Sequence, residues 1–284
     1  MQHPEKPISR KQLMIFIFLQ LIAIVALLVP RADSIPFTRI KAEGSTHISI
    51  SEPSDVCANP LNTNLFIVSD RGYLYETDAN YKLLRRSSTF GFDYEAVFAD
   101  SHFVYAVEER TRRINQFDIT TLEKVKTREV RYQGGRNAGY EGFTYNKEKG
   151  CFILVTEKNP IWIFELNRNF DPVNEFQLKE KLNGKPPGID LQSKEKHSIS
   201  EVWESVRGYT GPSDVSSLTL YGKKLYMLSD EDSEILQLNP ATYQLEKRWK
   251  LGILNPEGFY FDQTGNLFVL SDNMQKVYRF SPLS

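Results

Sequence analysis

Residues 257–280 read EGFYFDQTGNLFVLSDNMQKVYRF, and this stretch predicts three β-strands joined by two turns. The predicted strands cover 257–261, 266–271 and 276–280. The second strand is a continuous apolar run, and such runs are typical of strands that are buried on both faces. The stretch therefore predicts a small antiparallel sheet packed between two neighbours.

The same pattern occurs five times along the 284-residue chain. Each copy opens with Ser or Glu, continues through a small residue to a large apolar one, and closes with an acid after an apolar strand. The opening and closing residues of the copies are Ser54 and Asp70, Glu95 and Glu109, Glu141 and Glu157, Ser216 and Asp230, and Glu257 and Asp272. The copies begin 41, 46, 75 and 41 residues apart. Strand-rich repeats of about forty residues are typical of propeller blades, so the sequence predicts an all-β fold, a five-bladed β-propeller.

The long interval between the third and fourth copies leaves two alternatives open, a sixth blade or an insertion. Residues 183–209 contain Asn-Gly and Pro-Pro-Gly turn sequences and a charged stretch, but no apolar run of the buried-strand kind. The sequence therefore favours an insertion at about 183–209, and five blades rather than six.

The fifth copy has only three predicted strands before Ser284. Each of the other copies is followed by a more polar fourth strand, at 82–86, 124–132, 175–179 and 244–251. A joint between the first and last blades would remove exposed strand edges. We therefore expect residues 37–41 to supply the fourth strand of the last blade and to close the ring.

Residues 13–29 form an apolar run broken only by Gln20. Three cations precede the run and Arg31 alone follows it, which predicts a cytoplasmic N-terminus. The run is close to the lower limit for crossing a bilayer, and no good cleavage site follows it, so an uncleaved signal anchor is favoured over a cleaved signal peptide. The predicted parts are a cytoplasmic N-terminus at 1–12, a transmembrane signal anchor at 13–29, a linker at 30–36 and the propeller at 37–284. In a Gram-negative bacterium, this is a single-pass inner-membrane protein with a periplasmic propeller.

The composition is that of a folded protein, with 40% hydrophobic residues and a net charge of −1. A nucleic-acid-binding protein needs a basic face for phosphate contacts, so the charge argues against that class. No Gly-x-Ser-x-Gly or His-Glu-x-x-His motif is present, and the four histidines occupy no repeat position that faces the predicted channel. Metal-assisted hydrolysis needs no histidine and stays open.

The first two strands of each copy form a hairpin, which places the opening residue beside the closing acid. Because the innermost strands of a propeller line its channel, both sets of residues are predicted at one mouth. Further oxygen ligands come from residues two positions upstream, Glu52, Asp93, Asp214 and Asn255. Carboxylates gathered at one opening repel one another unless a cation neutralises them, and oxygen ligands favour Ca²⁺ or Mg²⁺ over zinc. A second interpretation stays open, in which the polar residues brace neighbouring blades.

Basic residues are concentrated in the second and third copies. They are Arg110, Arg112, Arg113, Arg128, Arg131 and Arg136. Together with a bound cation, these arginines could bind the phosphate or carboxylate group of a small anionic ligand. The alternative is that they are solvated loop charges paired with nearby acids.

Five motifs follow one another between residues 46 and 281. They are SDV at 54–56, DYE at 93–95, GYEGF at 139–143 with EKNP at 157–160, DVSSL at 214–218 with LSDE at 228–231, and PEG at 256–258. In this order they resemble the YjiK, or SdiA-regulated, family of bacterial envelope proteins, which is distantly similar to NHL-repeat propellers. The resemblance implies a five-bladed propeller with a bound calcium, an N-terminal anchor and no established activity.

Calcium is therefore the expected cofactor. Its expected ligands are Glu95, Glu141 and Glu257, with Glu109 and Glu157 behind them. We expect a membrane-anchored, periplasmic, calcium-binding propeller that binds an unidentified small anionic ligand or a protein. The alternative function is a calcium-dependent hydrolase of a phosphoester or a lactone.

Overall fold

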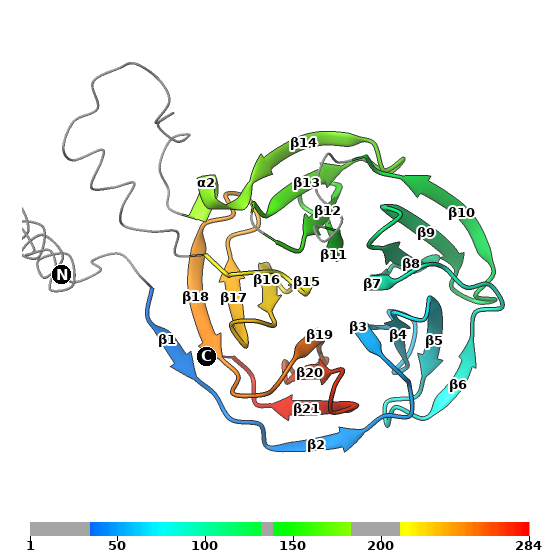
Figure 1. Cartoon of the computed structure of the whole chain (residues 1–284), viewed down its shortest axis with the longest axis horizontal. Coiled ribbons are helices and arrows are strands. Elements are labelled where there is room, and N and C mark those ends of the chain that lie inside the picture. The colour runs from blue at the N-terminus through cyan, green and yellow to red at the C-terminus, as the bar shows by residue number, and fades with distance from the viewer. Residues whose placement is uncertain (1–34, 132–138, 159, 183–210, 284) are drawn as a thin grey trace, which may run out of the picture. The chain divides into compact units, whose positions relative to one another are not determined.

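The computed structural model describes residues 35–131, 139–158, 160–182 and 211–283. These residues form five β-sheets around a central channel, and each sheet presents its first strand to the channel (Figure 1). The described residues belong to one compact unit. The predicted five-bladed β-propeller is therefore confirmed.

The blades follow the five copies of the repeat. Blade one contains β3 (Pro53–Ala58), β4 (Leu65–Ser69), β5 (Tyr73–Thr77) and β6 (Leu83–Arg86). Blade two contains β7 (Tyr94–Ala99), β8 (Phe103–Glu108), β9 (Arg113–Asp118) and β10 (Lys124–Glu129). Blade three contains β11 (Tyr140–Asn146), β12 (Cys151–Thr156), β13 (Trp162–Leu166) and β14 (Pro172–Gln177). Blade four contains β15 (Ser217–Tyr221), β16 (Lys224–Ser229), β17 (Glu234–Leu238) and β18 (Leu245–Lys250).

Blade five contains β19 (Pro256–Phe261), β20 (Leu267–Ser271) and β21 (Lys276–Phe280), and its outer strand is β2 (Gly44–His47). The expectation that residues 37–41 close the ring is wrong. β1 (Phe37–Arg39) instead pairs in parallel with β18 and adds a fifth strand to blade four. The closing strand must lie beside β21 immediately before the chain enters β3, so the segment nearest to β3 takes that position. Ile48 then continues the ladder, because its N–H donates to the Gln275 carbonyl at 2.9 Å.

The predicted outer strand of blade three is also displaced. β14 begins at Pro172 rather than at residue 175, and Leu178 already belongs to the short helix α2 (Leu178–Leu182). The register explains this, because β14 pairs along the whole of β13, from Leu166 opposite Pro172 to Trp162 opposite Gln177.

Apolar side chains pack between neighbouring blades in five clusters, one for each interface of the ring. The cluster between blades five and one joins Leu270 and Val277 to Ile67, all of them at most 2% exposed. Each fully buried aliphatic side chain of this size contributes about 1.5–3 kcal/mol to stability. The continuous apolar runs of the second strands thus form both faces of each blade, as the sequence predicted.

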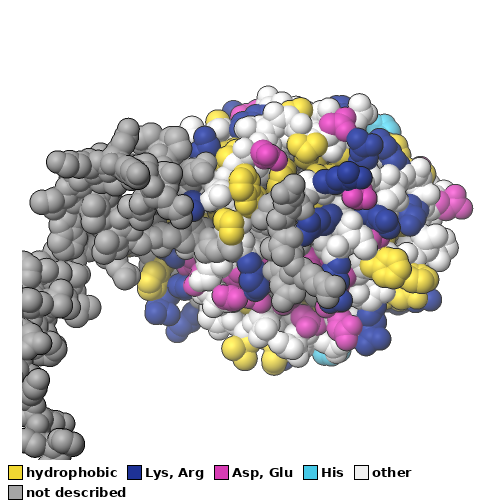
Figure 2. Space-filling model, turned by 45° about the horizontal axis from the view of Figure 1, so that its top comes forward, with side chains coloured by type: hydrophobic (Ala, Val, Ile, Leu, Met, Phe, Trp, Pro, Cys, Tyr) yellow, Lys and Arg dark blue, Asp and Glu magenta, His cyan; other side chains and the backbone are white. Residues whose placement is uncertain are grey.

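The structure does not describe the predicted signal anchor at 13–29 or the predicted insertion at 183–209. In the portion of the chain that it does describe, none of the helices combines the length and the hydrophobicity needed to cross a bilayer. On the face of the molecule shown in Figure 2, acidic and basic side chains are interspersed, in keeping with a net charge of −1.

Candidate metal site at the channel mouth

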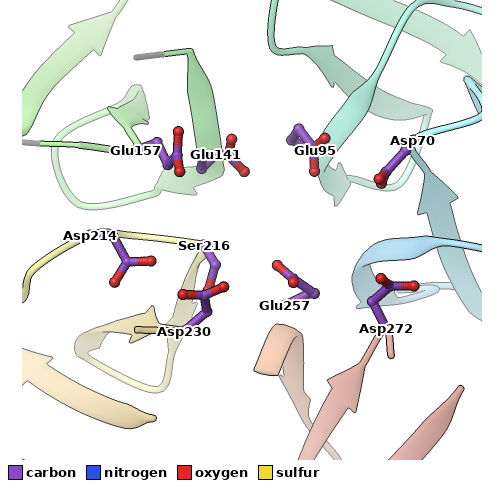
Figure 3. Close-up of a pocket in the computed structure, with 9 residues that line it drawn as sticks. All are labelled: Asp70, Glu95, Glu141, Glu157, Asp214, Ser216, Asp230, Glu257 and Asp272. Atoms are coloured by element: carbon purple, nitrogen blue, oxygen red, sulfur yellow. The ribbon is translucent and has the colours of Figure 1, made fainter. Parts of the chain in front are cut away.

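The opening polar residues of four blades are placed by β-bulges. In blade three, the ladder between β11 and β12 passes from Tyr140 to Gly142 and skips Glu141. The ladders of blades one, two and five skip Ser54, Glu95 and Glu257 in the same way. A bulge leaves its extra residue unpaired and re-aims the side chain. Here it directs the side chains of the three glutamates into the mouth of the channel (Figure 3).

The bends that precede the first strands bring the closing acids to the same mouth. Asp93 has a positive φ of 60°, and its carbonyl accepts a hydrogen bond of 2.9 Å from the Glu109 N–H. Glu52 has a φ of 50°, and its carbonyl accepts one of 3.1 Å from the Asp70 N–H. Positive φ is uncommon for residues other than glycine, and such strain is often found at functional sites.

The mouth is a cavity of about 200 Å³ that is lined almost entirely by carboxylates. Its lining residues are Asp70, Glu95, Glu141, Glu157, Asp214, Ser216, Asp230, Glu257 and Asp272 (Figure 3). Eight of these nine residues are acids and none is basic. All five blades contribute, so the cavity exists only because the ring is closed.

Two groups of three acids come close enough to share a cation. In one group the carboxylate oxygens of Glu109, Glu141 and Glu157 lie within 4.8 Å of one another, and in the other those of Asp70, Asp93 and Glu95 do. Of the five expected ligands, Glu109, Glu141 and Glu157 form the first group, and Glu95 belongs to the second. The fifth, Glu257, lines the same cavity without belonging to either group.

Burial and mutual repulsion raise the pKa of the acids at the mouth. The pKa of Glu141 and that of Glu95 lie well above the usual range, mainly because burial removes water from the carboxylates and secondly because neighbouring acids repel them. The same two causes raise the pKa of Glu257 to about 8. The pKa of Asp70 and that of Asp272 are also raised, again mainly by burial. Without a bound cation, ionising the carboxyl groups of the mouth thus costs free energy.

The serines and glutamates that open the copies differ in their partners. Ser54 donates a hydrogen bond to Asp70 of its own blade, and Ser216 Oγ donates one of 3.1 Å to the Pro256 carbonyl of blade five. Glu95, Glu141 and Glu257 have no hydrogen bond or ion pair with any residue that the structure describes. Glu141 is only 8% exposed. A buried carboxylate that lacks a partner is destabilising, and a bound ion or an ordered water is one way to satisfy it.

Basic residues that directly follow the closing acids lie at the rim of the mouth. Arg110 Nε is 2.6 Å from Asp93 Oδ2 and 3.8 Å from Glu109 Oε2, so it bridges the two groups of acids. Lys158 Nζ is 2.5 Å from Glu157 Oε1. The sequence interpretation missed Lys158, although a basic residue follows the closing acid in three of the copies.

The other polar residues expected near the mouth fall in different places. Asp214 lines the cavity, but Glu52 pairs with Arg71 at 3.1 Å, and Asn255 is not among the lining residues. The arginines do not form one group. Arg128 and Arg131 form exposed pairs with Asp171 at 2.6 Å and Glu129 at 3.3 Å, and Arg136 lies outside the described residues.

A closed ring of five blades with a carboxylate-lined cavity at one mouth defines the class, a five-bladed propeller with a candidate site for a hard cation. Comparison with protein families is more specific, because the family model described as SdiA-regulated matches residues 38–281. The chain belongs to the SdiA-regulated family. The resemblance seen in the sequence is therefore confirmed.

Two solved structures are similar to this chain. Glutaminyl cyclase from Myxococcus xanthus is 13% identical and has a TM-score of 0.60, over 86% of this chain and 97% of that one. The β-propeller domain of Cps50 (Swd1) from Myceliophteria_thermophila is 10% identical and has a TM-score of 0.47, over 81% of this chain and 66% of that one. No curated protein matches the chain significantly. At such identities the first likeness supports the fold alone, and the second carries no argument.

Proposed function

We propose that the acidic mouth binds a calcium ion and that the propeller serves as a calcium-dependent binding module. The observation that carries this proposal is the set of Glu95, Glu141 and Glu257, three carboxylates aimed into one cavity without partners among the described residues. A side chain that merely braces neighbouring blades has a partner in the next blade, as Ser216 does.

The residues present fit calcium. The donors are carboxylate oxygens with one serine hydroxyl, which are hard ligands, and neither histidine nor cysteine lines the cavity. Calcium accepts six to eight oxygens in irregular geometry, whereas magnesium demands a near-ideal octahedron. Ligands that come from different strands of a ring suit the irregular geometry of calcium better than the octahedral geometry of magnesium. Glu95, Glu141 and Glu257 would hold the ion, with Glu109 and Glu157 completing its surroundings. The side chains of the first three must move together to do so, because Glu95 and Glu141 belong to different groups of acids and Glu257 belongs to neither.

Calcium titration followed by thermal unfolding tests this proposal. A ligand that binds only the folded state stabilises it, so the unfolding midpoint should rise with calcium concentration. The Glu141→Gln variant should lose most of this shift, because the amide removes one negative charge at the buried centre of the cavity. The matched control is Glu129→Gln, which changes an exposed acid on β10 and should keep the shift. No shift for the unmodified protein at millimolar calcium would contradict the proposal.

We also propose that residues 13–29 anchor the protein in the bacterial inner membrane, with the N-terminus in the cytoplasm and the propeller in the periplasm. The support is the apolar run with its preceding cations. Protease added to spheroplasts should degrade the propeller, whereas intact cells should protect it. Protection in spheroplasts, or release of the propeller by osmotic shock, would contradict this placement.

A second candidate function is calcium-dependent hydrolysis of a phosphoester or lactone. The observation in its favour is Glu141, a buried carboxylate in a cavity lined by acids, whose pKa is raised by burial and by the neighbouring acids. Screening the calcium-loaded protein against both substrate classes, with Glu141→Gln beside it, separates the candidates. Turnover that Glu141→Gln abolishes would favour the hydrolase, and turnover that survives this substitution would exclude the mouth as its site.

A further inference from the structure

Exposed aromatic side chains border the acidic mouth on blade one. Phe90 and Phe92 are each 61% exposed, and they lie in the connection from β6 to β7. This connection crosses the mouth face of the propeller from the outer strand to the channel, because the first strand of every blade begins at the mouth. Phe92 directly precedes Asp93, which belongs to one of the two groups of acids. The phenylalanines therefore lie beside the candidate calcium site.

The two phenylalanines end a row of aromatic rings that begins inside blade one. The ring centroids of Tyr75 and Tyr73 are 6.1 Å apart, those of Tyr73 and Phe90 are 6.2 Å apart, and those of Phe90 and Phe92 are 6.4 Å apart. Arg86 covers the ring of Tyr73, with its guanidinium carbon 4.5 Å from the centroid. Rings that contact one another in this way restrict each other's orientation.

The backbone of this connection is fixed, so the exposure of the rings is built into the fold. The Gly91 N–H donates a hydrogen bond of 2.8 Å to the Gly72 carbonyl. Gly72 has a φ of 76°, and a Cβ atom at that residue would collide with the Gly91 carbonyl. Such a close approach of two loops requires glycine.

The neighbouring blade five extends the apolar surface. Leu254 is 70% exposed and precedes Asn255, just as Phe92 precedes Asp93. Met274 is 40% exposed and lies in the turn that follows Asp272. By contrast, Arg110 and Lys158 border the mouth on blades two and three. Arg71 also follows a closing acid, on blade one, where it pairs with Glu52 at 3.1 Å. The rim thus has an apolar part on blades five and one, which on blade one lies beside this ion pair, and a basic part on blades two and three.

We propose that this rim docks a polypeptide segment that carries a carboxylate beside bulky apolar side chains. The carboxylate would bind the calcium ion and Arg110, and the apolar side chains would contact Phe90, Phe92, Leu254 and Met274. The inference rests on the proposed calcium site, because without a cation the mouth repels a carboxylate. A partner carboxylate therefore enters the acid-lined mouth only as a direct ligand of the bound calcium ion.

The size of the cavity favours a polypeptide over a compact small molecule. Sites that enclose a drug-sized ligand usually measure about 300–1,000 Å³. The mouth measures about 200 Å³, which leaves room for an ion and one small polar group. The rest of the partner must then lie across the rim, where the exposed apolar side chains are spread over two blades. Phenylalanine and methionine are enriched in protein interfaces relative to the rest of the protein surface.

Fluorescence anisotropy with two labelled hexapeptides tests the proposal. One peptide places an internal Asp between Leu and Phe, and the other ends in Leu-Phe with a free carboxylate. Each has a matched control, with Asn for Asp or an amidated end. We expect binding in calcium that EDTA reverses, and at least tenfold weaker binding of the control peptides.

Two double variants test whether peptide binding depends on the apolar side chains of the rim or on any exposed apolar surface of the protein. The double variant Phe90→Ser/Phe92→Ser should weaken peptide binding at least tenfold and keep the calcium-dependent rise of the unfolding midpoint. The matched control Leu83→Ser/Leu84→Ser removes two apolar side chains that are 49% and 51% exposed on the outer strand of the same blade, and it should bind as the unmodified protein does. Equal loss in both double variants, or binding that ignores EDTA, would overturn the proposal.

The calcium-dependent midpoint of the same samples distinguishes the two proposals. If calcium raises the midpoint and neither peptide binds, the docking inference is overturned and the calcium site stands. If calcium has no effect on the midpoint, the calcium proposal fails first and the docking inference fails with it.

Discussion

Ser217 of blade four donates a hydrogen bond of 2.8 Å from its Oγ to Asp55 Oδ1 of blade one, across the channel. The other carboxylate oxygen of Asp55 accepts a hydrogen bond of 2.8 Å from the Val97 N–H of blade two. Blade five packs against the same residue, because a Cβ atom at Gly258 would lie 2.6 Å from Asp55 Cα. Buried Asp55 therefore joins its own blade to three others. It directly follows Ser54, so it lies one residue deeper in the channel than the residues that open each copy.

The first prediction concerns this brace. Asp55→Ala should lower the free energy of unfolding by about 2–4 kcal/mol, because it leaves buried donors from two other blades without acceptors. Ser217→Ala removes only one neutral donor and should cost about 1 kcal/mol. Urea unfolding of the metal-free protein measures both values. A cost below about 0.5 kcal/mol for Asp55→Ala would show that the channel is not held together at this residue.

The second prediction separates metal binding from bracing at Glu141. In the absence of calcium, Glu141→Gln should raise the unfolding midpoint. Burial and neighbouring acids raise the pKa of Glu141, so at neutral pH folding must either bury its charge or protonate it, and glutamine avoids both costs. A side chain that braced the blades would give the opposite sign. Differential scanning calorimetry in EDTA measures the difference, with Glu129→Gln as the control for loss of a surface charge. A lower midpoint for Glu141→Gln would support the bracing interpretation.

The third prediction is a dependence of stability on pH. The pKa of Glu257 is raised to about 8 in the folded protein, from about 4.3 in an unfolded chain. A folded-state pKa above the unfolded value means that stability falls as pH rises between the two values. The metal-free protein should therefore lose stability between about pH 5 and 8, and Glu257→Gln should lose less. Calcium should abolish the loss, because it binds the ionised carboxylates.

Urea unfolding at several pH values, with EDTA or with calcium, measures this dependence. The informative quantity is the difference in slope between the unmodified protein and Glu257→Gln, because groups away from the mouth contribute equally to both. The difference includes the acids that Glu257 repels, such as Glu95 and Glu141. Identical slopes in EDTA would mean that Glu257 titrates as it does in an unfolded chain.

The fourth prediction concerns the basic residues at the rim. Arg110 pairs with Asp93 and bridges toward Glu109, so it competes with a metal for the same oxygens. Arg110→Gln should therefore raise the calcium affinity about two- to fivefold, the range expected for an exposed ion pair. Arg131, which pairs with Glu129, is the matched control, and Arg131→Gln should leave the affinity unchanged. Isothermal titration calorimetry measures the calcium affinity of both variants. Weaker calcium binding by Arg110→Gln would show that Arg110 does not compete with calcium for these oxygens.

The ring was predictable from the sequence because its strongest signal is repeated. Second strands such as β4 and β12 are continuous apolar runs, and their spacing fixes the number of blades. The closing strand was not predictable. β1 and β2 are both short and fully exposed, so no buried side chain distinguishes them, and only the position of β21 beside the entry to β3 selects β2.

The mouth was predictable because hairpin geometry places the two ends of each copy together. The partners at the mouth were less accessible to sequence reasoning. The bulges that direct Glu95, Glu141 and Glu257 into the cavity come from a shift in strand register. No residue type in these strands predicts that shift. The brace at Asp55 had a visible signal, an acid at a position where the other copies have alanine, glycine or serine. Nothing in the sequence indicated that its partner is the serine of the fourth copy, Ser217, which lies 162 residues away.

The central claim is that the mouth holds a calcium ion, and the most direct test is a crystal structure of the propeller grown with calcium. We predict an anomalous difference peak inside the cavity, with carboxylate oxygens of Glu95, Glu141 and Glu257 at about 2.3–2.6 Å from it. A cavity that contains only water in millimolar calcium, with these glutamates hydrogen-bonded to one another, would contradict the claim.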